Sequence, residues 1–215
     1  MGHALKTIDR FYGLTPRGII HVGANSGQEV PDYMASDITP VVLIEPLQIP
    51  FKRLLKSIDN AEGFFPVQKC LSDVAGKTVI FNVASNSGQA SSYYEPENHL
   101  TIYPGVTFGE KIEFTTETLD AVVQGLSGSL DRSKLDYISL DTQGSELDII
   151  KGASRCLEDA KFVFLEVSFK GLYRDAPDMY EVIQFMRSKE FDLYHCLMRN
   201  KGWGDALFIK RGVVL

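Results

Sequence analysis

Short apolar runs alternate with amphipathic stretches along most of the chain. Residues 18–22 form an apolar run that ends in a glycine-containing turn at 23–27, and residues 28–36 then have the spacing of a helix. Residues 41–45 repeat this design and are followed by an amphipathic stretch at 51–58. Strands that alternate with helices indicate βαβ units and a parallel sheet, whose binding site lies at the carboxyl ends of the strands.

The middle of the chain departs from this rhythm. A third apolar run, 64–71, is followed by two stretches of alternating polar and apolar residues at 77–84 and 111–116. The segment between them, 85–104, is rich in Ser, Asn, Tyr and Pro. We therefore predict an inserted β-hairpin with a long loop that lies over the site.

The alternation resumes after the insertion. The pattern predicts a strand at 135–141, a helix at about 145–157, a strand at 162–167, a helix at 178–188 and two final strands at 191–197 and 206–210. The glycine-punctuated connection between the last two strands favours an antiparallel hairpin. The prediction is an α/β fold in one domain, residues 1–215, with a mostly parallel Rossmann-like sheet and an antiparallel C-terminal strand.

The amino-acid composition argues against several classes of binding partner. The formal net charge of the 215 residues is −6, which provides no long-range attraction for nucleic acid or an anionic membrane. No apolar run approaches the roughly 20 residues of a membrane-spanning helix, and Met1 to Tyr12 lacks the apolar region of a signal peptide. We expect a cytoplasmic protein without nucleic-acid partners. Cys70, Cys156 and Cys196 are expected to be core or near-core thiols.

The first glycine turn and the acid after it form the most informative local pair. Backbone N–H groups at a strand-to-helix turn suit a nucleotide-like ligand, and Gly23 and Gly27 allow its close approach. A dinucleotide-binding turn would have glycine where Asn25 and Gln28 stand. Glu45 ends the next strand, where a carboxylate can accept both hydrogen bonds of a ribose diol. A plain structural turn and a surface glutamate are the alternatives.

Three more acids follow apolar runs and so belong to the same edge of the sheet. Asp73, next to Ser72, is placed to accept a hydrogen bond from an adenine amino group, or it is a solvated turn residue. Asp141 ends the fourth strand and is the first catalytic candidate, because it can orient or deprotonate a hydroxyl. Glu166 ends the fifth strand and also points to the substrate side, unless it pairs with a cation such as Lys170.

Several ordered motifs resemble those of FkbM-type methyltransferases from about residue 18 to residue 210. They are HVGANSG at 21–27, IEP at 44–46, LSD at 71–73, TETLD at 116–120, LDTQGSE at 140–146 with KGA at 151–153, and FLE at 164–166. The resemblance implies a class I fold that uses S-adenosylmethionine (SAM), with S-adenosylhomocysteine as product. It also implies O-methylation of a sugar, glycolipid or natural-product hydroxyl.

By this resemblance Gly23, Gly27, Glu45, Ser72 and Asp73 fall at cofactor-binding positions. We also expect Asn25 and Asp141 to contact the cofactor, and no metal ligand is indicated. The family commonly has an acid before the glycine turn, where it meets the methionine ammonium of SAM. His21 stands there in this chain. A neutral imidazole can only accept from an ammonium, so Asp141, Glu29 or a backbone carbonyl is left for that role. A packed strand histidine is the alternative for His21.

Fewer sequence features indicate where the methyl acceptor binds. The segment 87–92, with Tyr93, Tyr94, His99 and Tyr103, carries groups that bind or stack on a sugar ring, although such a loop is often only connective. His195, in an apolar run, is expected to be a core histidine. An NAD-dependent oxidoreductase and a noncatalytic binding protein remain alternatives. The missing glycines and the lack of a Tyr-x-x-x-Lys pair count against the oxidoreductase.

Overall fold

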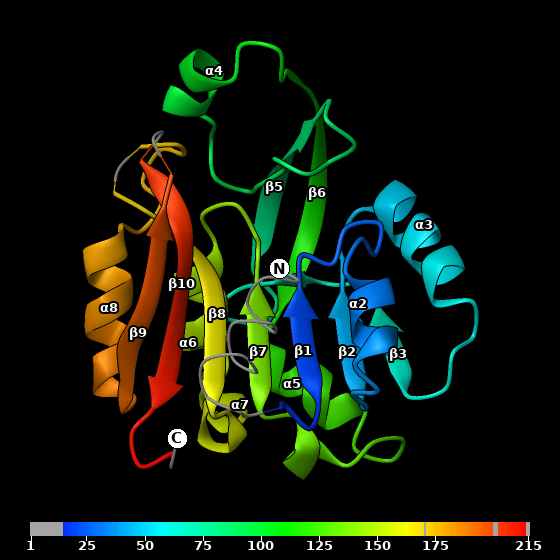
Figure 1. Ribbon diagram of the computed structural model, residues 1–215. Helices are drawn as coiled ribbons and strands as arrows, with labels where there is room; N and C mark the ends of the chain where they lie inside the picture. The colour runs from blue at the N-terminus through cyan, green and yellow to red at the C-terminus, as the bar shows by residue number, and fades with distance from the viewer. Residues whose placement is uncertain (1–14, 170, 200–201, 214–215) are drawn as a thin grey trace.

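A seven-stranded sheet forms the centre of the molecule in the computed structural model, which describes residues 15–169, 171–199 and 202–213 (Figure 1). Its order is β3-β2-β1-β7-β8-β10-β9, and β10 runs antiparallel to both neighbours. The strands are β1 (Ile19–Val22), β2 (Val41–Ile44), β3 (Phe64–Val67), β7 (Tyr137–Leu140), β8 (Phe162–Ser168), β9 (Phe191–Met198) and β10 (Trp203–Lys210). The predicted mostly parallel sheet with an antiparallel C-terminal strand is confirmed.

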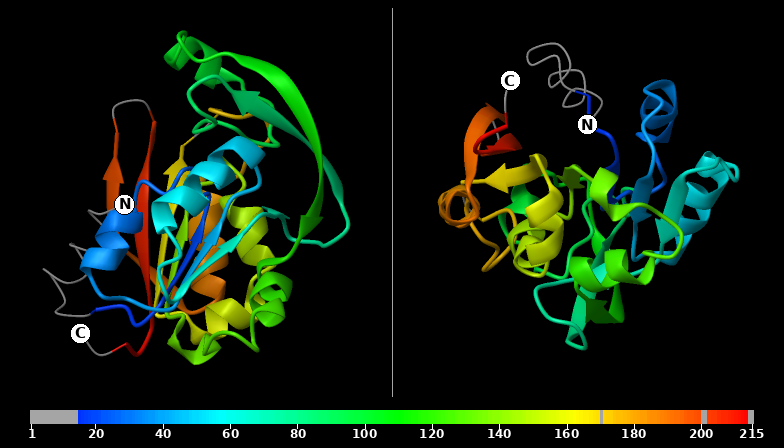
Figure 2. Two further views of the ribbon diagram at one scale, coloured as in Figure 1. Left: turned by 90° about the vertical axis from the view of Figure 1, so that its right-hand side faces the viewer. Right: turned by 90° about the horizontal axis from the view of Figure 1, so that it is seen from below.

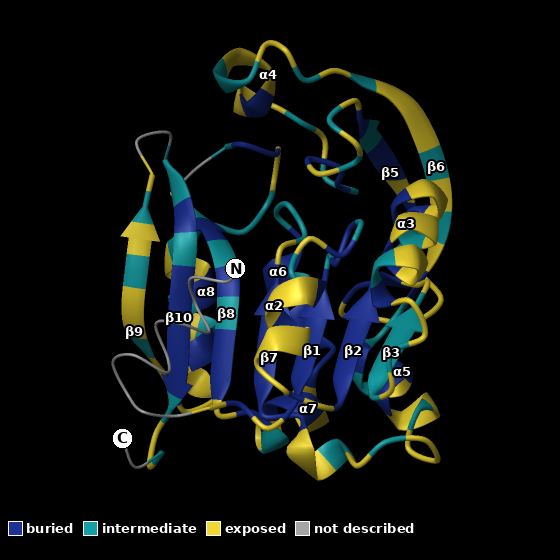
Figure 3. Cartoon of the chain, turned by 45° about the vertical axis from the view of Figure 1, so that its right-hand side comes forward, coloured by how far each residue is buried: buried dark blue, intermediate teal, exposed yellow. Residues whose placement is uncertain are grey.

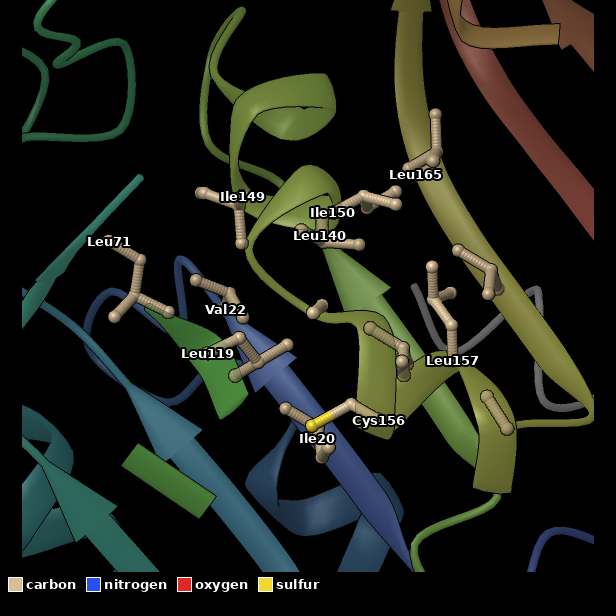
Figure 4. Close-up of a cluster of buried hydrophobic side chains, with 14 of the residues drawn as sticks. Ile20, Val22, Leu71, Leu119, Leu140, Ile149, Ile150, Cys156, Leu157 and Leu165 are labelled. Carbon is tan, nitrogen blue, oxygen red and sulfur yellow. The ribbon is translucent and has the colours of Figure 1, made fainter. Parts of the chain in front are cut away.

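Helices cover both faces of this sheet (Figure 2). One face packs against α2 (Val30–Ala35) and α3 (Gln48–Ile58); the other packs against α5 (Leu119–Gly125), α6 (Glu146–Lys151), α7 (Ser154–Asp159) and α8 (Met179–Ser188). Side chains alternate between the two layers, since Ile19 joins the first and Ile20 and Val22 join the second. Figure 4 shows the second layer. Both faces are buried, which explains why these strands read as continuous apolar runs.

The insertion forms a second, smaller sheet of order β4-β6-β5. It contains β4 (Cys70–Leu71), β5 (Thr78–Ala84) and β6 (Phe108–Glu117), with α4 (Asn98–Ile102) in the connecting loop. In Figure 1 the β5–β6 hairpin rises beyond the carboxyl ends of the parallel strands, as predicted. The run predicted as one strand, 64–71, is divided: β3 belongs to the large sheet and β4 pairs with β6.

The prediction of one helix at 145–157 was wrong, because the chain forms two separate helices there, α6 and α7. Gly152 has a low helix propensity and packs against the loop that follows β4. A Cβ added at Gly152 would lie 2.6 Å from the carbonyl oxygen of Ser72 in that loop. The Asp120 carboxylate then accepts hydrogen bonds from the backbone N–H groups of Arg155 and Cys156, both at 2.9 Å. These contacts start α7 at a point where the hydrophobic periodicity alone predicts that the first helix continues.

The prediction for His195 was also wrong, because His195 is exposed on β9. β9 is an edge strand with exposed and half-buried positions (Figure 3), and its register against β10 shifts between Leu193 and His195, so that Tyr194 and His195 are both exposed. Cys70 and Cys156 are buried free thiols and Cys196 is half-buried, as expected. The predictions for Met1 to Tyr12 and Lys170 lie outside the described residues. Within the described ranges, no helix is both long and apolar enough to cross a bilayer.

Candidate active site

A cavity of about 510 Å³ lies between the carboxyl ends of the parallel strands and the insertion. β1, β2, β7 and β8 reach it through His21, Glu45, Leu140 and Glu166, and the insertion covers it from the other side. Its position is the one expected for the ligand site of an open α/β sheet.

The turn after β1 is shaped by its glycines. Gly23 has φ +82°, and a Cβ added there would overlap the backbone carbonyl of Asp141. Gly27 has φ +79° and packs against the side chains of Leu54 and Ser57 rather than lining the cavity. The first glycine therefore lets the ends of β1 and β7 approach each other, while the second seats the turn on α3.

Glu45 is the organising acid of this end of the cavity. It is 5% exposed, and its two carboxylate oxygens accept hydrogen bonds from the backbone N–H groups of Asn25 at 3.0 Å and Leu47 at 2.8 Å. Burial raises the pKa of Glu45 to about 7, against the lowering effect of these two bonds. Asn25 itself has φ +44° and donates through its side chain to the Ser87 carbonyl at 3.2 Å, which joins the turn to the insertion.

His21 is buried at the end of β1 and lines the same cavity. Its Nδ1 lies 3.1 Å from the Tyr33 hydroxyl, while its Nε2 has no hydrogen-bond partner in the described chain. Burial lowers the pKa of His21 to about 3, so the ring is neutral at physiological pH. The histidine is therefore both a packed strand residue and a cavity residue, which combines the two alternatives left open by the sequence.

Ser72 and Asp73 lie just beyond the cavity lining. Ser72 is fully buried and donates to the Asp73 carboxylate at 3.0 Å, while Asp73 is exposed. The residues of this segment that line the cavity are Lys69, Cys70 and Leu71, joined by Tyr93 from the insertion. The role of Asp73 toward an adenine amino group stays a prediction.

Asp141 and Glu166 come together at the ends of adjacent strands, as their positions predict. The Gln143 amide nitrogen donates to both carboxylates, at 2.9 Å to Asp141 and 3.2 Å to Glu166. Desolvation raises the pKa of each acid, and for Glu166 the negative charge of Asp141 adds to the increase. Glu146 instead accepts backbone hydrogen bonds from Thr142 and Gly144, and so supports the loop.

The insertion supplies the roof of the cavity. The predicted substrate-loop residues that line it are Gly88, Gln89, Ala90, Ser91, Tyr93, His99 and Tyr103. The hydroxyls of Tyr93 and Tyr94 both donate to the Asp148 carboxylate, at 3.1 and 2.7 Å, and Tyr94 does not line the cavity. The Trp203 indole N–H donates to the Tyr103 hydroxyl at 2.7 Å, which closes the roof against β10. The lining residues that the sequence did not reveal include Arg199, which follows the carboxyl end of β9, and Asp205, which reaches the cavity because β10 runs antiparallel to β8.

Unpartnered polar atoms indicate that the cavity receives a polar ligand. His21 Nε2, His99 Nδ1 and Thr142 Oγ1 are buried without a hydrogen-bond partner in the described chain, and all three residues line the cavity. The charged lining residues are Glu29, Glu45, Asp141, Glu166 and Asp205 against Lys69 and Arg199. This excess of acids fits a sulfonium cofactor and disfavours a polyphosphate. Over the described ranges, no three His, Cys, Asp or Glu side chains are grouped to hold a metal ion.

Comparisons with known proteins agree with this geometry. Residues 21–193 match the model of the methyltransferase FkbM domain. The chain is 25% identical over 201 residues to the 2-O-methyltransferase NoeI of Sinorhizobium fredii, which covers 85% of this chain and 79% of that protein.

Two solved structures show the same fold at low sequence identity. A SAM-dependent methyltransferase from Aquifex aeolicus superposes with a TM-score of 0.50 at 10% identity, over 95% of this chain and 87% of the other. A putative RNA methyltransferase from Pyrococcus horikoshii also gives 0.50 at 10% identity, over 97% and 81%. The family match, the class I fold and the acid-lined cavity lead to one conclusion: the chain belongs to the FkbM methyltransferase family and is a SAM-dependent enzyme.

Proposed function

We propose that the protein transfers the methyl group of SAM to a hydroxyl of a small, sugar-containing acceptor. The observation that carries this proposal is the pair Asp141 and Glu166, held at the carboxyl ends of β7 and β8 beside the glycine turn. The similarity to a 2-O-methyltransferase supports transfer to oxygen.

In this proposal the adenosine of SAM lies along β1 and β2. Glu45 accepts the ribose hydroxyls, since its carboxylate is already oriented by two backbone N–H groups and retains free lone pairs. The ring of the adenine lies against Leu71 and Tyr93. The polar methionine end extends toward His21 Nε2 and Thr142 Oγ1, which have no hydrogen-bond partner among the described residues.

The chain's own contribution to the chemistry is alignment, exclusion of water and removal of one proton. Bound SAM supplies an electrophilic methyl group, and the electron pair of the broken C–S bond remains on sulfur. Asp141 accepts the proton that the acceptor hydroxyl loses as its oxygen forms the new bond to carbon. Glu166 holds a neighbouring hydroxyl, and the insertion keeps water from the reacting groups.

The composition of the acceptor end favours a neutral polyhydroxylated ring. Asn86, Gln89 and Asp205 offer hydrogen-bonding groups, and the rings of Tyr103 and Trp203 offer apolar faces. The only cations of the described lining are Lys69 and Arg199, and Arg199 is paired with Asp205 at 3.1 Å. A phosphate-rich acceptor such as RNA would meet mainly like charges here.

Calorimetry and a methyl-transfer assay test the proposal in two steps. SAM and S-adenosylhomocysteine should bind the purified protein, and NADH should not. Methyl glycosides, each paired with its 2-deoxy counterpart, then serve as acceptor probes in a mass-spectrometric assay, with oligoribonucleotides as the competing class. Methylation of glycosides that disappears in the deoxy partner supports the proposal. Cofactor binding with methylation of oligoribonucleotides alone would overturn it.

Glu45→Ala is expected to weaken SAM binding by about 1.5 to 3 kcal/mol, roughly a 10- to 150-fold increase in Kd, because two charged hydrogen bonds to the ribose are lost. Calorimetry at pH 8 measures it. Glu62→Ala is the matched control, since Glu62 is an exposed residue that does not line the cavity. An unchanged Kd in Glu45→Ala would remove Glu45 from the cofactor site.

The pH dependence of SAM binding gives a separate prediction. Because the pKa of Glu45 is about 7 in the free protein, the carboxyl is mostly protonated below that pH and must ionise to accept the ribose diol. SAM affinity should therefore fall about tenfold between pH 8 and pH 6 from this residue alone. Titrations at several pH values should show a shallower dependence in Glu45→Gln, and equal slopes in the two proteins would contradict the prediction.

A further inference from the structure

One amide side chain connects the two strand-end carboxylates to the far wall of the cavity. Gln143 Nε2 donates one hydrogen bond to Asp141 Oδ1 and another to Glu166 Oε2. The Tyr173 hydroxyl donates to Gln143 Oε1 at 3.1 Å. Because the nitrogen faces two acceptors and the oxygen faces a donor, the direction of the amide is fixed.

The backbone around Gln143 is built for this placement. Gln143 has φ +58°, a left-handed conformation that a side chain of this kind rarely adopts. Glu146 holds it there from both sides by accepting hydrogen bonds from the N–H groups of Thr142 at 2.8 Å and Gly144 at 2.9 Å. Uncommon backbone conformations maintained by their surroundings concentrate at functional sites.

The bridged carboxylates face several other charged groups. Glu146 approaches from α6 and Asp205 from β10, and both raise the pKa of Glu166 further. Glu29, before α2, interacts with Asp141 across the cavity. Arg199, paired with Asp205, acts in the opposite direction on Asp141. Within this excess of negative charge, the hydrogen bonds from Gln143 lower the pKa of both bridged acids.

We propose that Gln143 is a positioning residue for methyl transfer: its amide holds Asp141 and Glu166 in a fixed relative orientation and stabilises the ionised carboxylate that receives the acceptor proton. This inference rests on the proposed function. The single proton of the Tyr173 hydroxyl is shared between Gln143 Oε1 at 3.1 Å and the Ala90 carbonyl oxygen at 2.8 Å, so the same hydroxyl links the carboxylate pair to the roof. An acceptor under the roof is thereby aligned with the carboxylates.

Carbon-13 NMR of the side-chain carboxyls tests the inference without an acceptor. The protein is labelled in Asp and Glu, saturated with S-adenosylhomocysteine and titrated with acid, and Asp141→Asn and Glu166→Gln assign the two resonances. Gln143→Met preserves the length of the side chain but removes the amide. We expect it to raise the apparent pKa values of the pair by about one unit. Gln124→Met, an exposed residue on α5, is the matched control and should leave both unchanged.

Tyr173→Phe is a second, milder variant that leaves Gln143 in place. It should move the same two resonances in the same direction by less than Gln143→Met does. With any glycoside methylated by the wild type, Gln143→Met should lower kcat about tenfold and shift the acidic limb of the pH–rate profile upward, while the Kd for SAM changes little.

The outcomes separate this inference from the proposed function. Unchanged carboxyl titrations in a folded Gln143→Met protein overturn the inference, whatever the protein methylates. Shifted titrations without methylation of any glycoside retain the bridge between the carboxylates but refute the acceptor class. If S-adenosylhomocysteine fails to bind, the proposed cofactor site is refuted, and the titrations, repeated without ligand, still decide whether Gln143 controls the pair.

Discussion

Asp141→Asn is expected to lower kcat by about 10²- to 10⁴-fold, the usual contribution of a general base. The amide keeps the size of the side chain but cannot take the proton of the acceptor hydroxyl at neutral pH. The Kd for SAM should change much less than kcat, because the carboxylate acts on the acceptor in our proposal. Steady-state kinetics with the best glycoside, together with calorimetry for SAM, measures both effects.

Asp205→Asn provides the comparison for this experiment. Asp205 lines the same cavity from β10 and is paired with Arg199, so its substitution removes one negative charge without touching the end of β7. Because Asp205 offers a hydrogen bond to the acceptor in our proposal, Asp205→Asn should mainly raise KM, and a loss of kcat confined to Asp141→Asn supports a role in proton transfer. Equal losses of kcat and SAM affinity in Asp141→Asn would instead make Asp141 a cofactor ligand.

Among substitutions of a glycine by alanine, Gly23→Ala should destabilise the fold most. The new Cβ would overlap the Asp141 carbonyl, and the residue would also have to adopt φ +82°. Overpacking against backbone together with left-handed strain should lower the free energy of unfolding by about 2 to 5 kcal/mol. Urea denaturation gives this value, and calorimetry on any folded fraction should show lost SAM binding, because the ends of β1 and β7 are pushed apart.

Gly76→Ala separates the two causes. Gly76 has nearly the same backbone angle, φ +80°, but a Cβ added there meets no atom within 4 Å. It should therefore cost only the conformational strain, about 1 to 2 kcal/mol. If the two variants were equally stable, close packing of the glycine turn against Asp141 would be excluded as the reason for glycine at position 23.

The fold was predictable where its causes are local. β1, β2 and β7 are buried on both faces, so each appears in the sequence as an apolar run with a turn behind it. The separation of β3 from β4 depends on pairing between Leu71 and Glu117, which lie far apart in the chain. The break between α6 and α7 depends on contacts of Gly152 and Asp120 with other segments. Periodicity records neither kind of contact.

The same distinction between local causes and contacts of distant segments applies to the candidate site. Parallel strands bring their ends together, so the positions of Glu45, Asp141 and Glu166 followed from topology alone. The bridging role of Gln143 did not, because it depends on a left-handed residue and on a hydroxyl from Tyr173, 30 residues further along the chain. The sequence signal available was the Gln-Gly pair, which indicates a tight turn but not what the glutamine side chain contacts.

The reversed direction of β10 has a consequence for how the walls of the cavity are built. A strand that opposes its neighbours presents its first residues at the edge where the others end, so Trp203 and Asp205 join the cavity beside Glu166. The C-terminal hairpin thus contributes to the wall beside Glu166, the turn after β1 and the end of β2 build the wall beside Glu45, and the insertion reaches both. In our proposal, substitutions in the C-terminal hairpin therefore change the groups offered to the acceptor without altering Glu45 or the turn after β1.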